Sequence, residues 1–340
     1  MSRKLVLTFG PDDWARTRFV RSLLFETTQA VRTLMHPGKQ RYQRPWLATI
    51  DRADARARLP ILAALNPPSG WVPDFLAPPP RSNDRTVDDE LHEIATFPSA
   101  LVVTELQRSL DSHPTRGRQA LLEPLIADPD IALARIAAEL HQAWLTLIAP
   151  FWAPVRELIS ADIAFRSREI TRGGLGQALN DLHPSVSWQD GVVTVEPAFD
   201  DGRIDLAGAG LALMPSAFVW PQVIVVHEAS WPPTIVYPAR GIGALWAAPP
   251  APSAALAGVL GRTRAMLITD LGQPSTTTAL AARHRLSPAA VSVQLGRLRD
   301  AGLISGQRLG KEVHYRRTPL AEALIHAVPP GSYPRLDTPG

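Results

Sequence analysis

Side chains that can hydrogen-bond to the edges of nucleic-acid bases gather in one short stretch of the sequence, residues 287–299. Gln294 can form a paired hydrogen bond with adenine, Arg297 can do so with guanine, and Ser292 can pair with either base. These residue types at this spacing are suited to reading base pairs in the major groove of a DNA duplex. The small Ala289 precedes them, where it would let the backbone approach the floor of the groove.

The residues around this stretch predict a helix that would present those side chains together. Ser287 followed by Pro288 is a strong helix start, because Ser caps the first amide groups and Pro fits the first turn. Ser287 also lies where its hydroxyl could contact DNA. Gly302 is a natural end for the helix. Apolar residues recur at helical spacing on one face: Val291, Leu295 and Leu298.

A shorter helix is predicted just before this one, from Thr277 to His284. Leu280 and Ala281 would pack inward, and the start of the helix is polar. Thr277 could therefore offer its hydroxyl and backbone N–H to a DNA phosphate.

After Gly302 the sequence changes from helical to alternating spacing, which predicts two strands, 303–308 and 313–318, joined by a turn at 309–312. We expect Arg308, Lys311 and His314 to lie where such a hairpin meets phosphates or a minor groove. Tyr315 is expected to pack beneath the hairpin. Two helices followed by a hairpin, in this order, favour a winged helix-turn-helix over an ordinary small α/β fragment with a solvated basic face.

The distribution of charge agrees with this interpretation. The chain carries a net charge of +3, but the segment from Arg262 to His326 has nine Arg and one Lys against two Asp and two Glu. That segment is therefore +6 and the remainder −3. Basic charge is concentrated where the DNA-contacting residues are predicted.

This segment resembles the ArsR-type winged-helix repressors. The resemblance implies a dimer, formed largely by flanking helices that would here span Ala254 to Leu271 and Leu320 to Val328. Val293 and Gly296 depart from the family, which often has polar or basic residues there. The metal-binding thiolates of many members are absent, because the chain has no Cys. The resemblance is carried by Leu280-Ala281, Ser287-Pro288, Val291-Ser292, Leu295, Leu298, Ala301-Gly302-Leu303-Ile304, Gly310 and Val313-His314-Tyr315.

The whole chain predicts an α+β fold with a helical and mixed-sheet N-terminal domain, residues 1–245, before the winged helix-turn-helix domain, residues 246–328. Residues 1–180 are rich in helix signals and residues 181–245 in strand signals, and a loose tail is expected over 329–340. A long helix is predicted from Pro154 to Arg172, ended by Gly173-Gly174. A hairpin is predicted around Asp190-Gly191, and Leu211–Met214 with Phe218–Val226 is expected to form a central pair of strands. The N-terminal region resembles a domain of unknown function found before ArsR-like winged helices in actinobacterial regulators. Its matching pieces include Arg44-Pro45-Trp46-Leu47, Gly173-Gly174-Leu175 and Tyr237-Pro238-Ala239-Arg240-Gly241.

Two groups in this domain could bind a small organic molecule, because aromatic walls with a few polar groups suit such ligands. One is Trp14 with Arg18, and the other comprises Trp220, Trp231, Tyr237 and Arg240. The alternatives are an amphipathic helix with its Arg residues paired to Asp12 or Glu26, and core aromatics packed between sheet and helices. Asp162 and Arg166 are interpreted as an ion pair one helical turn apart.

The sequence favours a homodimeric, ligand-responsive regulator that binds a near-palindromic operator, and the resemblance to ArsR-type proteins implies that it is a repressor. A regulator controlled by a protein partner, and an enzyme fused to a DNA-binding domain, remain alternatives. No catalytic residue, cofactor or metal site is predicted: the nine His are scattered, and neither a phosphate-binding Gly motif nor a G-x-S-x-G motif occurs. The absence of a signal peptide predicts a cytoplasmic protein. The uncharged Leu206 to Val226 contains Pro residues and is expected to form two buried strands rather than a membrane span.

Overall fold

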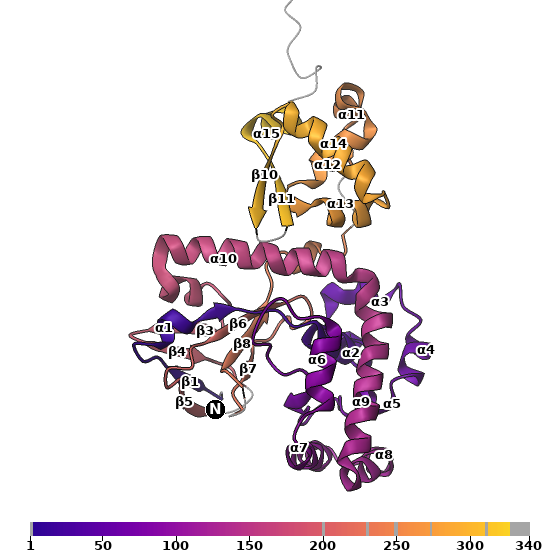
Figure 1. Cartoon of the computed structure of the whole chain (residues 1–340), viewed down its shortest axis with the longest axis vertical. Coiled ribbons are helices and arrows are strands. Elements are labelled where there is room, and N and C mark those ends of the chain that lie inside the picture. The colour runs from indigo at the N-terminus through magenta and orange to yellow at the C-terminus, as the bar shows by residue number, and fades with distance from the viewer. Residues whose placement is uncertain are drawn as a thin grey trace, which may run out of the picture. The chain divides into compact units, whose positions relative to one another are not determined.

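The computed structural model of the chain describes residues 3–198, 201–228, 231–247, 251–272, 274–309 and 312–326 and has a mixed α+β fold (Figure 1). The chain divides into two compact units, Met1–Trp246 and Ala247–Gly340, called here the N-terminal and C-terminal units. No helix among the described residues is both long enough and apolar enough to cross a membrane. The predicted tail at 329–340 and Lys311 lie outside the described residues.

The N-terminal unit contains a helical part and two small sheets. Its helices are α1 Asp13–Arg16, α2 Leu23–Met35, α3 Arg44–Leu47, α4 Arg52–Ala57, α5 Pro60–Ala64, α6 Val87–Ala95, α7 Ser99–Ser112, α8 Arg116–Ala127, α9 Pro129–Ala143 and α10 Trp152–Asn180. Short 3₁₀ turns lie at Pro37–Lys39, Arg41–Gln43, Asp74–Leu76, Ala149–Phe151 and Ile242–Ala244, and a π-helical turn follows α9 at Trp144–Ile148. Its strands are β1 Leu5–Thr8, β2 Arg18–Phe19, β3 Val186–Gln189, β4 Val192–Val195, β5 Gly202–Asp205, β6 Ala212–Ser216, β7 Ile224–Val226 and β8 Thr234–Pro238.

Helix α2 is the centre of the helical part and is buried along most of its length. Ser22 caps it by accepting a hydrogen bond from the Phe25 N–H at 2.9 Å. Glu90 of α6 reaches the same helix end, where its carboxylate accepts from the Leu24 N–H at 2.9 Å and from the Ser22 hydroxyl at 2.8 Å. The amide groups that begin α2 are thus satisfied by a side chain distant in the sequence.

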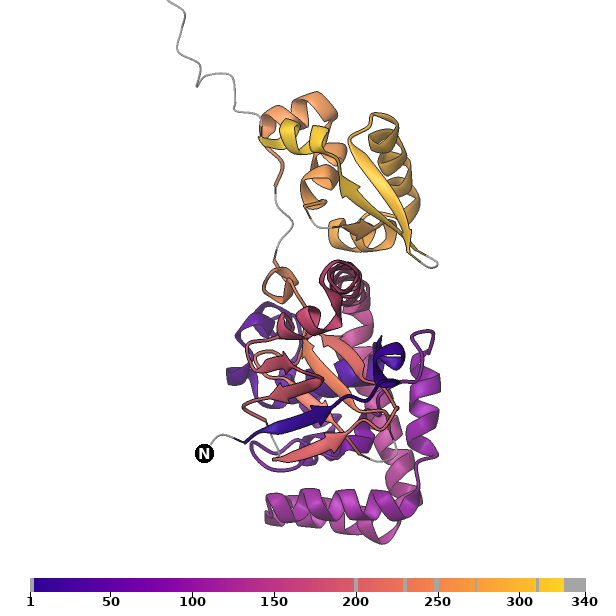
Figure 2. The same ribbon diagram turned by 90° about the vertical axis from the view of Figure 1, so that its left-hand side faces the viewer.

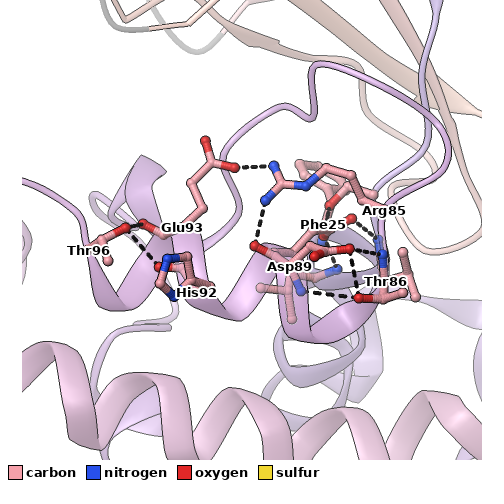
Figure 3. Close-up of polar contacts among 11 residues, drawn as sticks. Phe25, Arg85, Thr86, Asp89, His92, Glu93 and Thr96 are labelled. Carbon is pink, nitrogen blue, oxygen red and sulfur yellow. Dashed lines mark hydrogen bonds and ion pairs between the residues drawn. The ribbon is translucent and has the colours of Figure 1, made fainter.

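Helix α6 begins with a capping box between Thr86 and Asp89, which Figure 3 shows beside Arg85. The Thr86 N–H donates to Oδ2 of Asp89 at 2.8 Å, and the Asp89 N–H donates to the Thr86 hydroxyl at 3.2 Å. Arg85 pairs with Glu93 one to two turns further along the helix (Figure 3). These contacts fix the start of α6 and so place Glu90 against α2.

The strands of the N-terminal unit form two four-stranded sheets, in the orders β3-β4-β1-β5 and β2-β6-β8-β7. The predicted hairpin around Asp190-Gly191 is confirmed as β3 and β4, with both turn residues at positive φ (49° and 82°). Strand β1 pairs antiparallel with β4 and parallel with β5, so the first strand of the chain lies inside a sheet otherwise built from residues after 185. Figure 2 shows this indigo strand among the later ones.

The second sheet corrects the expectation that Leu211–Met214 and Phe218–Val226 form a central pair. Strand β6 is fully buried, but its neighbours are β2 and β8, and β7 is an edge strand that pairs with β8. Residues between Ser216 and Ile224 turn away instead of continuing a strand, and the backbone of Ala217 is held by Glu26 and Gln43. Strand β8 can therefore enter the sheet beside β6.

Helix α10 carries the predicted ion pair and bends at a predicted break. Gly174 has φ +81° and ψ 168°, which is not helical, so the helix changes direction there instead of ending. Before the break, Asp162 and Arg166 are both buried, with Arg166 Nε 3.7 Å from Asp162 Oδ1. The interpretation of these two residues as an i, i+4 pair is confirmed.

The C-terminal unit has its own hydrophobic core and one three-stranded sheet in the order β10-β11-β9. Its helices are α11 Ala254–Leu260, α12 Arg262–Asp270, α13 Thr277–His284, α14 Pro288–Asp300 and α15 Pro319–His326, and its strands are β9 Ser275–Thr276, β10 Ile304–Leu309 and β11 Glu312–Arg317.

Candidate nucleic-acid interface

Helix α14 is divided into a buried face and an exposed face, as its sequence predicts. Ser287 caps it by accepting from the Ala290 N–H at 3.2 Å, and Pro288 occupies its first turn. The buried residues are Val291, Leu295 and Leu298, each at most 1% exposed. The surface on the other side includes Ser287, Ala289, Ser292 and Arg297, which are exposed, and Gln294, which is half-buried.

Helix α13 packs against α14 and is held at both ends. Thr276 caps its start by accepting from the Ala279 N–H at 3.2 Å, and Arg285 ends it in the left-handed conformation with φ 55°. The half-buried Thr277 is the first residue of the helix. The turn between the two helices is therefore tight, and the start of α13 has a polar character.

A buried carboxylate ties α12 to α13. Asp270 lies 2.8 Å from Arg283 NH1 and 2.9 Å from His284 Nε2, and its side chain is only 5% exposed. The sequence analysis did not single out these residues. Asp270 is not part of any sequence motif. Its pairing with Arg283 and His284 becomes apparent only when α12 and α13 are seen packed side by side.

Strands β10 and β11 form the predicted hairpin, with Ile304 opposite Arg317 and Arg308 opposite Val313. Arg308 is exposed, whereas Tyr315 is half-buried against the core of the unit, as expected. Strand β9 adds a third strand by placing Thr276 opposite His314.

His314 is a correction to the predicted DNA contacts. The residue is only 6% exposed, at the position where β11 pairs with β9. A side chain buried in this way is not available to a phosphate, so His314 belongs to the frame of the hairpin and not to its surface.

The residues of the two predicted ligand-binding groups make separate contacts in the N-terminal unit. Trp14 packs against Trp188, with ring centroids 4.8 Å apart, and Arg18 donates to the Arg16 carbonyl at 3.3 Å. Trp220 contacts Tyr42, and Trp231 stacks on Phe97. The alternative that Arg residues near Trp14 pair with Glu26 is also wrong. Glu26 is buried, and its carboxylate accepts a hydrogen bond from the Ala217 N–H instead.

Tyr237 and Arg240 do come together, at the buried carboxylate of Asp162. The Tyr237 hydroxyl donates to Asp162 Oδ2 at 2.8 Å, and the Arg240 backbone N–H donates to Oδ1 at 3.0 Å. Burial raises the pKa of the Asp162 carboxyl, and it raises the pKa of Tyr237 well above its ordinary value. Tyr237 is fully buried and cannot form the wall of an open ligand site, so this cluster joins α10 to β8.

Comparison with known proteins adds one finding. Residues 95–243 match a family of unknown function (DUF5937), which covers less than half of the chain. No curated protein matches the sequence, and no solved structure matches the fold.

Proposed function

We propose that this protein is a DNA-binding transcriptional regulator whose C-terminal unit is a winged helix-turn-helix of the ArsR type. In this proposal α13 and α14 are the helix-turn-helix, α14 lies in the major groove, and the β10–β11 hairpin is the wing. The observation that supports it best is the division of α14. Its apolar residues are buried in the core of the unit, while Ser292 and Arg297 are exposed on its other side.

The residues divide into base-reading and phosphate-binding groups. Ser292, Gln294 and Arg297 would hydrogen-bond to base edges, with Ser287 and Ala289 at the close approach of the helix to the groove. Thr277, Arg308 and Lys311 would bind phosphates, which fixes the position of the unit without specifying sequence.

A homodimer would place two such helices on a near-palindromic operator, with half-sites about 34 Å apart, one turn of the duplex. Two exposed apolar side chains support a second copy as the partner: Val259 of α11 is 76% exposed and Leu320 of α15 is 59% exposed. Both helices contribute to the same core, so the two residues belong to one small unit that leaves apolar surface uncovered.

The N-terminal unit would act as the effector-binding part of a repressor. A small organic molecule that binds one dimer geometry better than the other would change DNA affinity by that difference in free energy. Release of the operator on ligand binding is the direction we propose.

Genome-wide capture of DNA fragments by the purified full-length protein, followed by titration of the best fragment at several salt concentrations, tests the proposal. A palindromic motif bound tightly, with affinity that falls steeply as salt rises, is expected. Weak binding without sequence preference would contradict a specific regulator. The same titration with a scrambled fragment of equal length provides the non-specific reference.

A further inference from the structure

Several helix ends of the N-terminal unit meet around a surface cavity of about 440 Å³ that is open to solvent. Its lining comes from the end of α2, from α4, from the segment after α5, and from the junction of α7 and α8, all labelled in Figure 1. The volume lies within the range of about 300–1,000 Å³ typical of small-molecule sites. None of the residues predicted from the sequence to bind a ligand lines it.

The charge of the lining is entirely of one sign. The charged side chains are Arg56 and Arg118, and the imidazoles of His36 and His113 also border the cavity; among the described residues no Asp or Glu lines it. The remaining lining includes apolar groups such as Met35 and Pro67. A ligand that fits this surface has an anionic group and an apolar part.

The guanidinium group of Arg118 is the most restricted of these side chains, because the residue is only 8% exposed and is held by several hydrogen bonds. Its Nε donates to the Ala64 carbonyl at 2.7 Å, and NH2 donates to the Ser109 carbonyl at 3.0 Å and hydroxyl at 2.9 Å. NH1 donates to the His113 carbonyl. These partners are all neutral.

In the described part of the chain, no carboxylate pairs with Arg118. Burial of a charge without an opposite charge is costly. The pKa of Arg118 is accordingly lowered by burial. An anion in the adjoining cavity would supply the opposite charge that the protein itself does not provide.

The second guanidinium is already oriented toward the same region. Arg56 donates through Nε to the Leu34 carbonyl at 3.1 Å and through NH2 to the Met35 carbonyl at 3.2 Å. His36 is held nearby, with Nε2 2.8 Å from the Asn66 carbonyl oxygen. Backbone carbonyls thus hold the cationic side chains in place before any ligand binds, which lowers the entropy cost of binding.

We propose that this cavity binds a small organic anion, through a carboxylate or phosphate group placed between Arg56 and Arg118. The apolar part of the anion would pack against Met35 and the prolines. Anion binding is inferred from the cavity alone. A role of the bound anion as the effector of the regulator rests on the proposed DNA function.

Ligand-observed NMR titration of the full-length protein, without DNA, tests the proposal with three aromatic probes: benzoate, its neutral isostere benzamide, and phenyl phosphate. At least one anion is expected to bind with a dissociation constant near 1 mM or below, about −4 kcal/mol, and benzamide at least tenfold more weakly. Binding of benzoate alone would indicate a carboxylate ligand, and binding of phenyl phosphate alone a phosphate.

Variants locate the site. Arg56→Gln and His113→Gln should each weaken anion binding, with Arg56→Gln reducing affinity about tenfold or more, the loss of one charged hydrogen bond. Arg58→Gln is the control, because Arg58 is an exposed neighbour that pairs with Asp54 and does not line the cavity. It removes the same charge and should change little.

Three results would overturn the proposal: binding of neither anion up to about 10 mM, equal binding of benzamide, or anion binding that Arg56→Gln and His113→Gln leave unchanged. Because no DNA is present, these outcomes are independent of whether the C-terminal unit binds an operator.

Discussion

Tyr237 of β8 donates a hydrogen bond from its hydroxyl to Oδ2 of Asp162 on α10, at 2.8 Å and across 75 residues of sequence. Both side chains are buried. Together with the Arg240 N–H bond to Oδ1 of Asp162, this contact joins the sheet β2-β6-β8-β7 to the longest helix of the N-terminal unit, and Arg166 pairs with Asp162 from the next turn of α10.

Tyr237→Phe should destabilise the N-terminal unit by about 1–3 kcal/mol, because a buried carboxylate oxygen loses its donor. Urea unfolding of the full-length protein followed by Trp fluorescence is a suitable measurement, since all nine Trp lie before residue 247. Tyr42→Phe is the control: the ring of Tyr42 packs on Trp220, and among the described residues its hydroxyl has no hydrogen-bond partner. Equal stability of the two variants would count against the assigned role of the hydroxyl.

Glu26 predicts a pH dependence of stability. Burial raises the pKa of its carboxyl from 4.5 to about 8. Across this window the folded protein holds the proton more tightly than the unfolded chain, so the free energy of unfolding falls as pH rises. The loss through Glu26 is on the order of a few kcal/mol between about pH 4.5 and 8.

Glu26→Gln should remove this part of the pH dependence, because the amide stays neutral and its oxygen still accepts from the Ala217 N–H. As pH rises, the urea midpoint of the variant should therefore increase relative to that of the wild type. Glu123→Gln, a change at an exposed position of α8, is the reference. A difference that does not vary with pH would refute the raised pKa.

Gly210→Ala should be strongly destabilising. Gly210 has φ +74°, and a Cβ there would lie 2.6 Å from the backbone of Arg16. The Gly210 N–H also donates to Asp13 at 2.8 Å, so a shift of the backbone would break a buried hydrogen bond. We expect a loss of at least about 2 kcal/mol. Gly117→Ala, within α8 and with open space around it, should instead stabilise by about 0.5–1 kcal/mol.

Features set by neighbouring residues could be predicted from the sequence, whereas features set by contacts between distant segments could not. Ser287-Pro288 and Asp190-Gly191 specify a helix start and a hairpin turn within a few residues, and both were predicted correctly. His314 is buried on β11 where that strand pairs with β9, a two-residue strand before α13 that no periodicity reveals. The cavity beside Arg118 depends on the meeting of helix ends far apart in sequence.

Arg297→Ala should cost about 1–3 kcal/mol in operator affinity and relax the preference at one base position. Arg308→Ala should weaken all sequences alike and reduce the salt slope by about one. Competition binding with single-base operator variants separates the two effects. Arg58→Ala removes the same charge from the N-terminal unit and should leave both affinity and slope unchanged. Unaltered operator selectivity in Arg297→Ala would rule out its base-reading role.

Val259→Glu and Leu320→Glu should each weaken the proposed homodimer, since both would place a charge on exposed apolar surface of the C-terminal unit. Sedimentation velocity over a range of protein concentrations measures the change. Leu145→Glu, at a side chain 51% exposed in the N-terminal unit, is the matched control. A monomeric wild type, or dimers equally stable in all three variants, would exclude this interface.

The position of β1 between β4 and β5 has a consequence for synthesis of the protein. The strand leaves the ribosome long before its partners, residues 192–195 and 202–205, so it must wait for most of the N-terminal unit before it can pair. Until then an apolar strand with two open edges is exposed to other nascent chains. Translation that stalls before residue 205 would yield a product unable to complete this sheet, and such fragments should be prone to aggregation and capture by chaperones.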